Sequence, residues 1–373
     1  MMGILSNNRF IVEILTTIIR AIFFFWGSCS ASDVPASFIF GDSLVDAGNN
    51  NYIFSLSRAN YYPNGIDFGQ PTGRYTNGRT MADIIGQELG MKTFAPPYLA
   101  PTTAGPVVLK GVNYASGGGG ILGNTGQIFV GRIDMDAQLD NFENTRQEII
   151  SDIGVAAAMK LLSESLFSVA MGSNDFINNY LLPVLSIPER ALVSPQNFVD
   201  SMISKYRLQL TRMYRLGARK IVVINVGPIG CIPNQREFHL SAGDDCSAFP
   251  NQLAKLFNDR LRHLVKEISS NLNGSIFVYA DVYRIVGDIV ENYTSYGFEN
   301  ADSACCNFAG RFGGLVPCGP LSRVCPDRSK YIFWDLFHPS DAANVLIAQR
   351  LMDGDCSDIF PINIRQLARA RLP

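Results

Sequence analysis

Five apolar, strand-forming segments alternate with helix-forming segments along most of this chain. The predicted strands cover residues 35–40, 107–114, 165–171, 220–226 and 275–280. Segments with helical spacing of apolar residues include 80–89, 133–150, 154–163, 195–216 and 250–272. Because strands that alternate with helices pair in parallel through right-handed crossovers, this pattern predicts an α/β fold with a parallel sheet between layers of helices.

Polar residues follow three of these predicted strands directly. Gly41, Asp42 and Ser43 follow the first strand, four glycines at residues 117–120 follow the second, and residues 172–175 follow the third. Open α/β sheets bind ligands at the carboxyl ends of their strands. We therefore expect these three groups to border one site.

Ser43 has two interpretations when its own segment is considered alone. Its hydroxyl can serve as a nucleophile, or Asp42 or Ser43 can cap a following helix. A serine hydroxyl is a weak nucleophile unless the chain also supplies a base, a group that orients the base, and donors for an oxyanion.

His338 has the surroundings expected of such a base. It follows Asp335 by three residues at the junction of a loop and a predicted helix, so the carboxylate can reach Nδ1 while Nε2 faces outward. The other two histidines, His239 and His263, lie in polar, helix-like surroundings without a comparable carboxylate. We predict that His338 is the base.

Two features are suited to binding an oxyanion. The glycine run at residues 117–120 can aim N–H groups at a ligand, or it can be a flexible turn. Asn174 can donate from its amide, or it can be a turn or cap residue. The loop at residues 49–79 and the segment at residues 178–188 are the expected pocket walls.

Composition excludes several classes of protein. The chain has 373 residues, 47% of them hydrophobic, with 31 basic against 33 acidic side chains. This argues against disorder and against a nucleic-acid partner. We expect residues 32–373 to form a single domain, since α/β domains reach this length.

The first 31 residues have the character of a secretory signal. Arg9 precedes an apolar region that ends in small residues at 27–31. Glu13 and Arg20 interrupt this region, so no run reaches the roughly 18 to 20 uncharged residues of a membrane span. A cleaved signal is therefore favoured over an uncleaved anchor, and we expect the mature protein to be secreted without stable membrane insertion.

Cysteine usage agrees with secretion. Seven cysteines follow the predicted signal: Cys231, Cys246, Cys305, Cys306, Cys318, Cys325 and Cys356. The adjacent pair at 305–306 and the lack of paired Cys-x-x-Cys motifs favour disulfides over zinc, and Cys356 is the expected free thiol. Asn273 and Asn292 begin sequons for N-glycosylation.

Four separated blocks, at residues 41–44, at Gly117, at 172–175 and at 335–338, together resemble the plant GDSL esterase/lipase family of the SGNH-hydrolase superfamily. The resemblance extends from about residue 35 to residue 367 and includes segments 71–79, 225–233 and 338–344. It implies a flavodoxin-like three-layer α/β/α sandwich around a central five-stranded parallel sheet.

The same resemblance implies a catalytic triad in which Ser43 is the nucleophile, His338 the general base and then acid, and Asp335 the group that orients it.

The oxyanion hole implied by the family consists of the backbone N–H groups of Ser43 and Gly117 and the side chain of Asn174. Gly118 is the alternative to Gly117 within the glycine run.

These assignments predict a secreted, extracellular serine esterase or lipase that acts on carboxylic esters as a monomer, without a metal or organic cofactor. An acyltransferase that uses the same acyl-enzyme is one alternative, and an inactive secreted binding protein is another. The blocks do not select among acylglycerols, cutin-type polyesters, phenolic esters and acetylated sugars.

Overall fold

The computed structural model of the protein describes residues 33–183, 186–238 and 246–372. The predicted signal segment and His239 lie outside these ranges. A central sheet has the strand order β1 (Ser37–Gly41), β2 (Leu166–Ala170), β3 (Lys220–Ile224), β4 (Ile276–Ala280) and β9 (Ile359–Phe360). The first four strands are parallel, and β9 pairs with β4 in the antiparallel sense.

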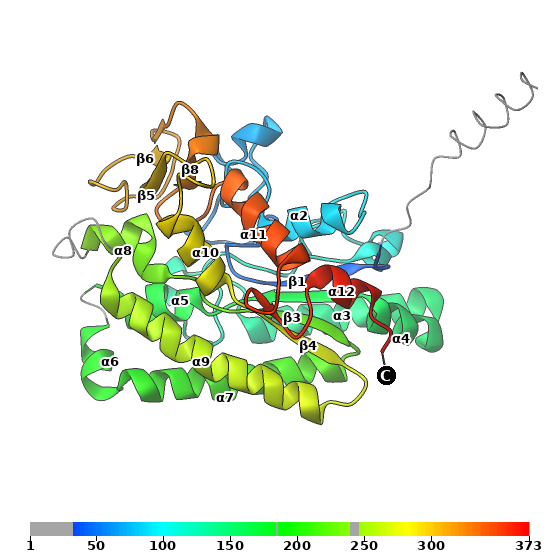
Figure 1. Ribbon diagram of the computed structural model, residues 1–373. Helices are drawn as coiled ribbons and strands as arrows, with labels where there is room; N and C mark the ends of the chain where they lie inside the picture. Colours follow the sequence, from blue (N-terminus) through cyan, green and yellow to red (C-terminus); the bar gives the residue numbers. More distant parts are fainter. Residues whose placement is uncertain (1–32, 184–185, 239–245, 373) are drawn as a thin grey trace, which may run out of the picture. The chain divides into compact units, whose positions relative to one another are not determined.

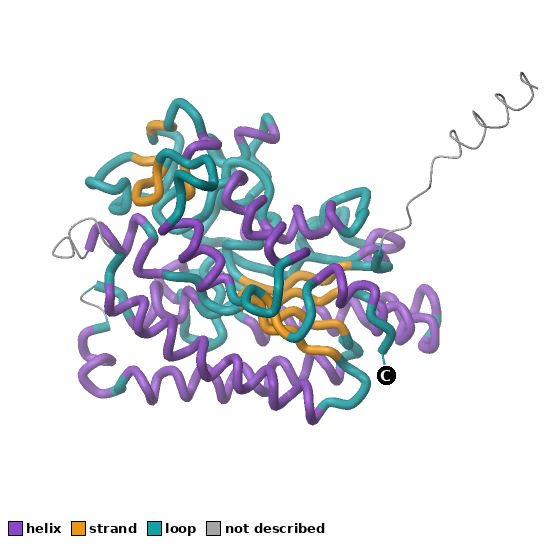
Figure 2. Tube along the Cα trace, viewed as in Figure 1, coloured by secondary structure: helices purple, strands orange, loops and turns teal. Residues whose placement is uncertain are grey.

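Helices cover both faces of this sheet (Figure 1). One layer contains α3 (Met135–Ile153), α7 (Pro195–Arg215) and α9 (Ala248–Asn271). The opposite layer contains α2 (Met81–Glu88), α10 (Val282–Glu291), α11 (Asp341–Asp353) and α12 (Ile364–Arg369). The layers are also visible in Figure 2, where the strands lie between helices. The predicted α/β sandwich is confirmed.

Shorter elements connect these layers. The α-helices are α4 (Val155–Glu164), α5 (Ser173–Asp175), α6 (Ile187–Leu192) and α8 (Pro233–Phe238). The 3-10 helices are η1 (Asn49–Tyr52), η2 (Ile66–Phe68), η3 (Gly105–Lys110), η4 (Gln127–Phe129), η6 (Ile229–Cys231) and η8 (Arg328–Lys330), and η5 (Phe176–Tyr180) is a π-helical turn.

Burial explains why the strands are apolar along their whole length. Every residue of β1, β2 and β3 is buried, as expected for parallel strands covered on both faces. Phe38 and Phe40 of β1 contact Phe142 of α3 and Phe167 of β2 with ring centroids 5.0 to 6.5 Å apart. This aromatic cluster anchors the strand that leads to Ser43.

The predicted strand at residues 107–114 is wrong for most of its length. Residues 105–110 form η3, whose first turn contains Pro106, a residue suited to starting a helix. Only the following residues are extended beside β1: Ile39 N–H donates to Val112 O at 3.0 Å, and Tyr114 N–H donates to Ile39 O at 2.7 Å. The fifth strand of the sheet is instead β9, so the sheet is mostly parallel rather than wholly so.

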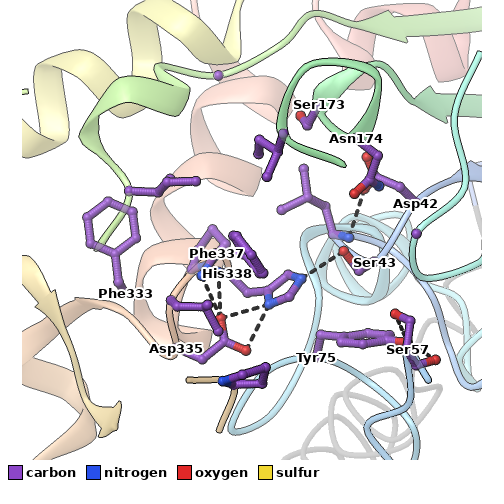
Figure 3. Close-up of a pocket in the computed structure, with 18 of the residues that line it drawn as sticks. Asp42, Ser43, Ser57, Tyr75, Ser173, Asn174, Phe333, Asp335, Phe337 and His338 are labelled. Carbon is purple, nitrogen blue, oxygen red and sulfur yellow. Dashed lines mark hydrogen bonds and ion pairs between the residues drawn. The ribbon is translucent and has the colours of Figure 1, made fainter. Parts of the chain in front are cut away.

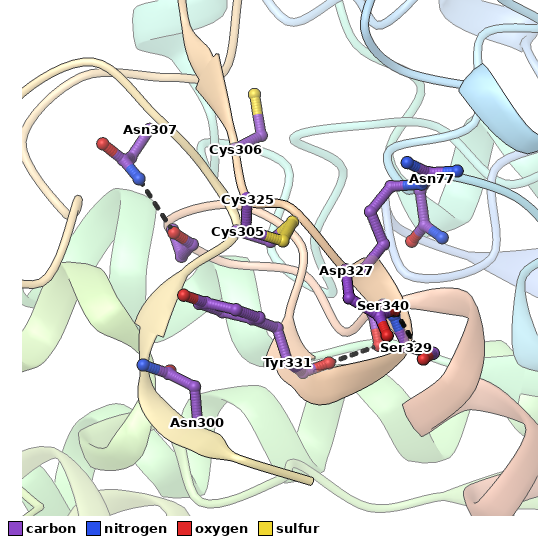
Figure 4. Close-up of a disulfide and its surroundings, with 12 residues drawn as sticks. Asn77, Asn300, Cys305, Cys306, Asn307, Cys325, Asp327, Ser329, Tyr331 and Ser340 are labelled. Carbon is purple, nitrogen blue, oxygen red and sulfur yellow. Dashed lines mark hydrogen bonds between the residues drawn. A yellow bond between two sulfur atoms is a disulfide. The ribbon is translucent and has the colours of Figure 1, made fainter.

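Disulfides hold a small region built from β5 (Asn300–Ala304), β6 (Cys306–Asn307), β7 (Arg323–Val324) and β8 (Tyr331–Phe333). Cys305 is bonded to Cys325 (Figure 4), Cys306 is bonded to Cys318, and Cys231 and Cys246 form a third pair. These pairs use the sulfurs that a zinc site would have needed, so the preference for disulfides is confirmed. Cys356 is a free, exposed thiol, as predicted.

Trp334 joins this region to the loop at residues 49–79. Its side chain is fully buried against the cysteines, and its Nε1–H donates to Asn64 Oδ1 at 2.8 Å. Ile66 packs against the same cluster. In the described ranges, no helix combines the length and apolarity of a membrane span.

Candidate active site

The turn after β1 presents the Ser43 side chain. Asp42 O accepts the N–H groups of Val45 and Asp46, at 3.2 and 3.1 Å, and Asp42 Oδ1 accepts Leu44 N–H at 3.0 Å. Asp42 therefore stabilises the turn, and no helix begins directly after it. Ser43 therefore does not cap a helix, and the Ser43 hydroxyl is available to another partner.

That partner is His338, which lies on the loop between β8 and α11 (Figure 3). Its Nε2 lies 2.7 Å from Ser43 Oγ. Its Nδ1 lies 2.8 Å and 2.9 Å from the two carboxylate oxygens of Asp335. Asp335 and His338 are both buried, so this chain of contacts is shielded from solvent.

Backbone hydrogen bonds hold the loop around Asp335 in place. Asp335 Oδ1 accepts the N–H groups of Phe337 and His338, both at 2.8 Å. Trp334 N–H donates to His338 O at 2.8 Å, and Ser340 caps α11. These hydrogen bonds fix the loop and so orient the imidazole of His338.

The N–H groups of Gly117 and Gly118 differ in their hydrogen bonds. Gly117 N–H donates to Asp46 Oδ2 at 3.0 Å, so it is already used. Gly118 lines the pocket that contains Ser43 and His338, and its φ of 81° is a conformation that favours glycine. In the described part of the chain, the N–H groups of Gly118 and Ser43 have no hydrogen-bond acceptor.

Asn174 lies in the same pocket, at the start of the helix after β2. Its Nδ2 donates one hydrogen to Gly119 O at 3.0 Å, which leaves the second hydrogen of the amide for a ligand. Asn178 Nδ2 donates to Asn174 Oδ1, and this contact fixes the orientation of the amide.

Three buried polar residues that sequence reasoning missed hold the glycine run against this turn. Asp46 accepts Gly117 N–H, and Asn50 Nδ2 donates to Gly117 O at 2.8 Å. Asp175 accepts the N–H groups of Ile121 and Leu122, both at 2.9 Å. Asp46, Asn50 and Asp175 lie in the segments that follow β1 and β2, and this position was the available signal in the sequence.

Burial raises the pKa of three carboxyl groups around the site. The pKa of Asp42 rises from 3.8 to about 7, although the hydrogen bond from Leu44 lowers it. The pKa values of Asp46 and Asp175 rise to about 6 for the same reason, against the opposing effect of the backbone N–H groups that they accept. Oδ2 of Asp42 has no hydrogen-bond partner among the described residues.

The pocket beside Ser43 is lined mainly by apolar side chains, including Leu56, Phe129, Ile177, Ile232, Val286 and Phe333. The loop at residues 49–79 forms part of its wall through residues 56–58, Tyr61, Asn64 and Tyr75, as expected. Among the described residues of segment 178–188, only Asn178 lines it. Most of that second predicted wall lies elsewhere.

Comparison with known proteins identifies close relatives. Residues 38–351 match the family described as GDSL-like lipase/acylhydrolase. GDSL esterase/lipase At4g16230 from Arabidopsis thaliana is 60% identical over 363 residues, which cover 97% of this chain and 99% of the relative. GDSL esterase/lipase At3g50400 from the same organism is 51% identical over 360 residues, with coverage of 93% and 96%. GDSL esterase/lipase At2g23540, also from Arabidopsis thaliana, is 51% identical over 337 residues, with coverage of 89% and 87%.

Proposed function

This chain belongs to the GDSL-like lipase/acylhydrolase family and is a carboxylic ester hydrolase, and we propose that Ser43, His338 and Asp335 carry out the hydrolysis. The observation that carries the proposal is the 2.7 Å contact between Ser43 Oγ and His338 Nε2, with both Asp335 oxygens within 2.9 Å of Nδ1. This is the geometry that activates a serine hydroxyl.

In the acylation step, Ser43 Oγ attacks the ester carbonyl carbon while His338 Nε2 takes the hydroxyl proton. Asp335 holds the Nδ1–H tautomer and stabilises the imidazolium that forms. When the C–O bond to the alcohol breaks, His338 returns the proton to the leaving oxygen. Water then attacks the acyl-enzyme with His338 again as base, which releases the carboxylic acid and restores the Ser43 hydroxyl.

The oxyanion of each tetrahedral intermediate is stabilised by the N–H groups of Ser43 and Gly118 and by the Asn174 amide. Gly118 takes the place of Gly117 in this proposal because Gly117 N–H donates to Asp46. Donors that are fixed in advance and shielded from water stabilise such a charge without reorganisation.

The apolar pocket favours esters with an apolar acyl chain over acetylated sugars, because a sugar needs polar groups to replace its hydrogen bonds with water.

We further propose that residues 1–31 are a cleaved secretory signal and that residues 32–373 are the mature, secreted domain. The disulfides support this, because such bonds persist in oxidising compartments. Asn273 and Asn292 are exposed, as glycosylation requires. Amino-terminal sequencing and glycosidase treatment of protein collected from the culture medium test the cleavage and the glycans.

A fluorophosphonate probe tests the nucleophile. We expect the probe to modify Ser43, as identified by peptide mass spectrometry, and Ser43→Ala to abolish both labelling and ester hydrolysis. Ser173 also lines the pocket, so Ser173→Ala is a matched control that should keep the labelling. Labelling that persists in Ser43→Ala would remove Ser43 from the mechanism.

A further inference from the structure

Exposed apolar side chains gather around the mouth of the pocket. Of the nineteen large apolar side chains exposed in the described residues, ten lie in segments 52–62, 128–130 and 308–321. We name these exposed side chains the apolar rim. Phe54, Val130 and Leu321 are the most exposed in their segments, at 77%, 60% and 83%. Exposed apolar side chains that gather in one patch mark an interaction site.

The rim is continuous with the pocket. Leu56 and Phe129 line the pocket on one side, and Pro317 and Cys318 line it on another. Leu56 N–H donates to Phe129 O at 2.9 Å, which joins the first two segments. Trp334 and Ile66 join the loop that carries the first segment to the disulfide-bonded region, and the two regions lie side by side in Figure 1.

The backbone at Val130 supports a role for its exposed side chain. Its φ of 67° and ψ of −67°, with Gly131 N–H donating to Phe129 O at 2.8 Å, form the rare and strained type of γ-turn. A β-branched residue in this conformation is an outlier. Strain of this kind persists mainly at functional sites, and here it presents an apolar group to water.

The rim carries little charge within its own three segments. Its three segments contain no acidic residue and two basic ones, Arg58 and Arg311. Arg58 donates to Ile53 O, and the guanidinium of Arg311 lies 5.0 Å from the centre of the Phe312 ring. A surface that binds an anionic membrane typically carries several exposed basic residues. The surface therefore fits an uncharged apolar partner.

We propose that the apolar rim is an adsorption surface, by which the enzyme docks on the interface of a water-insoluble, uncharged ester and draws an acyl chain from that interface into the pocket. This inference rests on the proposed function of the pocket. Adsorption removes the rim from water, which favours binding in proportion to the apolar area covered.

Adsorption is measured in a Ser43→Ala background, so that turnover does not alter the interface. The protein is mixed with a trioleoylglycerol emulsion, and the bound fraction is determined by flotation. Val130→Asn combined with Leu321→Ser should weaken adsorption by at least about tenfold. Asparagine is more common than a β-branched valine at positive φ.

The chain offers a matched control outside the rim. Val155 and Leu192 are 61% and 86% exposed, close to the values for Val130 and Leu321. Val155→Asn combined with Leu192→Ser should keep adsorption within about twofold of the parent. Equal adsorption of the rim variant and the parent, or an equal loss in both variants, would overturn the proposal.

Two further arms separate this inference from the proposed function. With Ser43 present, both double variants should hydrolyse a short, water-soluble ester like the parent, while only the rim variant is slow on the emulsion. If the parent does not hydrolyse the soluble ester, the proposed function is overturned. The flotation experiment in the Ser43→Ala background would still show whether the rim binds the emulsion. Stronger binding to anionic phospholipid vesicles than to the emulsion would refute the uncharged partner.

Discussion

Replacing Asp42 by asparagine tests the electrostatic consequence of burying a carboxyl group beside the nucleophile. One Asp42 oxygen accepts Leu44 N–H, and the other has no partner in the described residues. Burial raises its pKa from 3.8 to about 7. The folded protein therefore keeps a proton that the unfolded chain loses near pH 4. Stability from this group is fully present below about pH 4 and is lost as the pH rises to about 7.

The size of the effect follows from that pKa difference. At about 1.4 kcal/mol per pKa unit, a rise from 3.8 to about 7 makes the free energy of unfolding about 4 kcal/mol smaller at pH 8 than at pH 4. Asparagine has the shape of the neutral acid and does not titrate, so Asp42→Asn should lack this contribution. Asp46 and Asp175 titrate in both proteins, and comparing the two proteins removes their effect.

The assay is urea unfolding at pH 4 and pH 8 with the disulfides intact. Trp334 is buried and is the only tryptophan after residue 32, so its fluorescence reports unfolding near the site. We expect stability to fall by about 4 kcal/mol more in the parent than in Asp42→Asn. Asp140 is exposed on α3, and Asp140→Asn should follow the parent within about 1 kcal/mol. If Asp42→Asn also follows the parent this closely, the burial argument is refuted.

Four further substitutions test other parts of the molecule. Asn174→Ala should lower the turnover of a soluble ester by about 10²–10³ with unchanged thermal unfolding, and near-normal activity would exclude Asn174 from the mechanism. Arg74→Met leaves the buried Asp83 carboxylate without its ion pair and should cost about 3–5 kcal/mol in urea unfolding. Arg79 forms a more exposed ion pair with Asp341, so Arg79→Met should lower the free energy of unfolding by under about 1 kcal/mol. Equal losses of stability in Arg74→Met and Arg79→Met would contradict the role of burial. Cys356→Ser should remove one reactive thiol in a native thiol titration and change the unfolding free energy by under about 0.5 kcal/mol, whereas a larger loss would show that Cys356 is structural.

Local patterns in the sequence predicted most of the elements. Strands β2, β3 and β4 and the long helices α3, α7 and α9 appear close to their predicted bounds, because apolar periodicity reflects which residues an element buries. The strand predicted at residues 107–114 was the exception. It is apolar enough for a strand, but Pro106 starts a 3-10 helix there, and β9 is too short to leave a periodic signal.

The fold class is encoded in local spacing, as apolar runs that alternate with helical segments. The residues proposed for ester hydrolysis, Ser43, Asp335 and His338, came from the resemblance of short sequence blocks to the GDSL family. The N–H group available beside the pocket depends instead on a contact between distant segments. Gly117 and Gly118 are equivalent in the sequence, and a hydrogen bond from Gly117 to Asp46, 71 residues away, makes Gly118 the available one. The apolar rim was likewise hidden, because its segments are separated along the chain and meet only when the disulfide-bonded region packs beside the loop at residues 49–79.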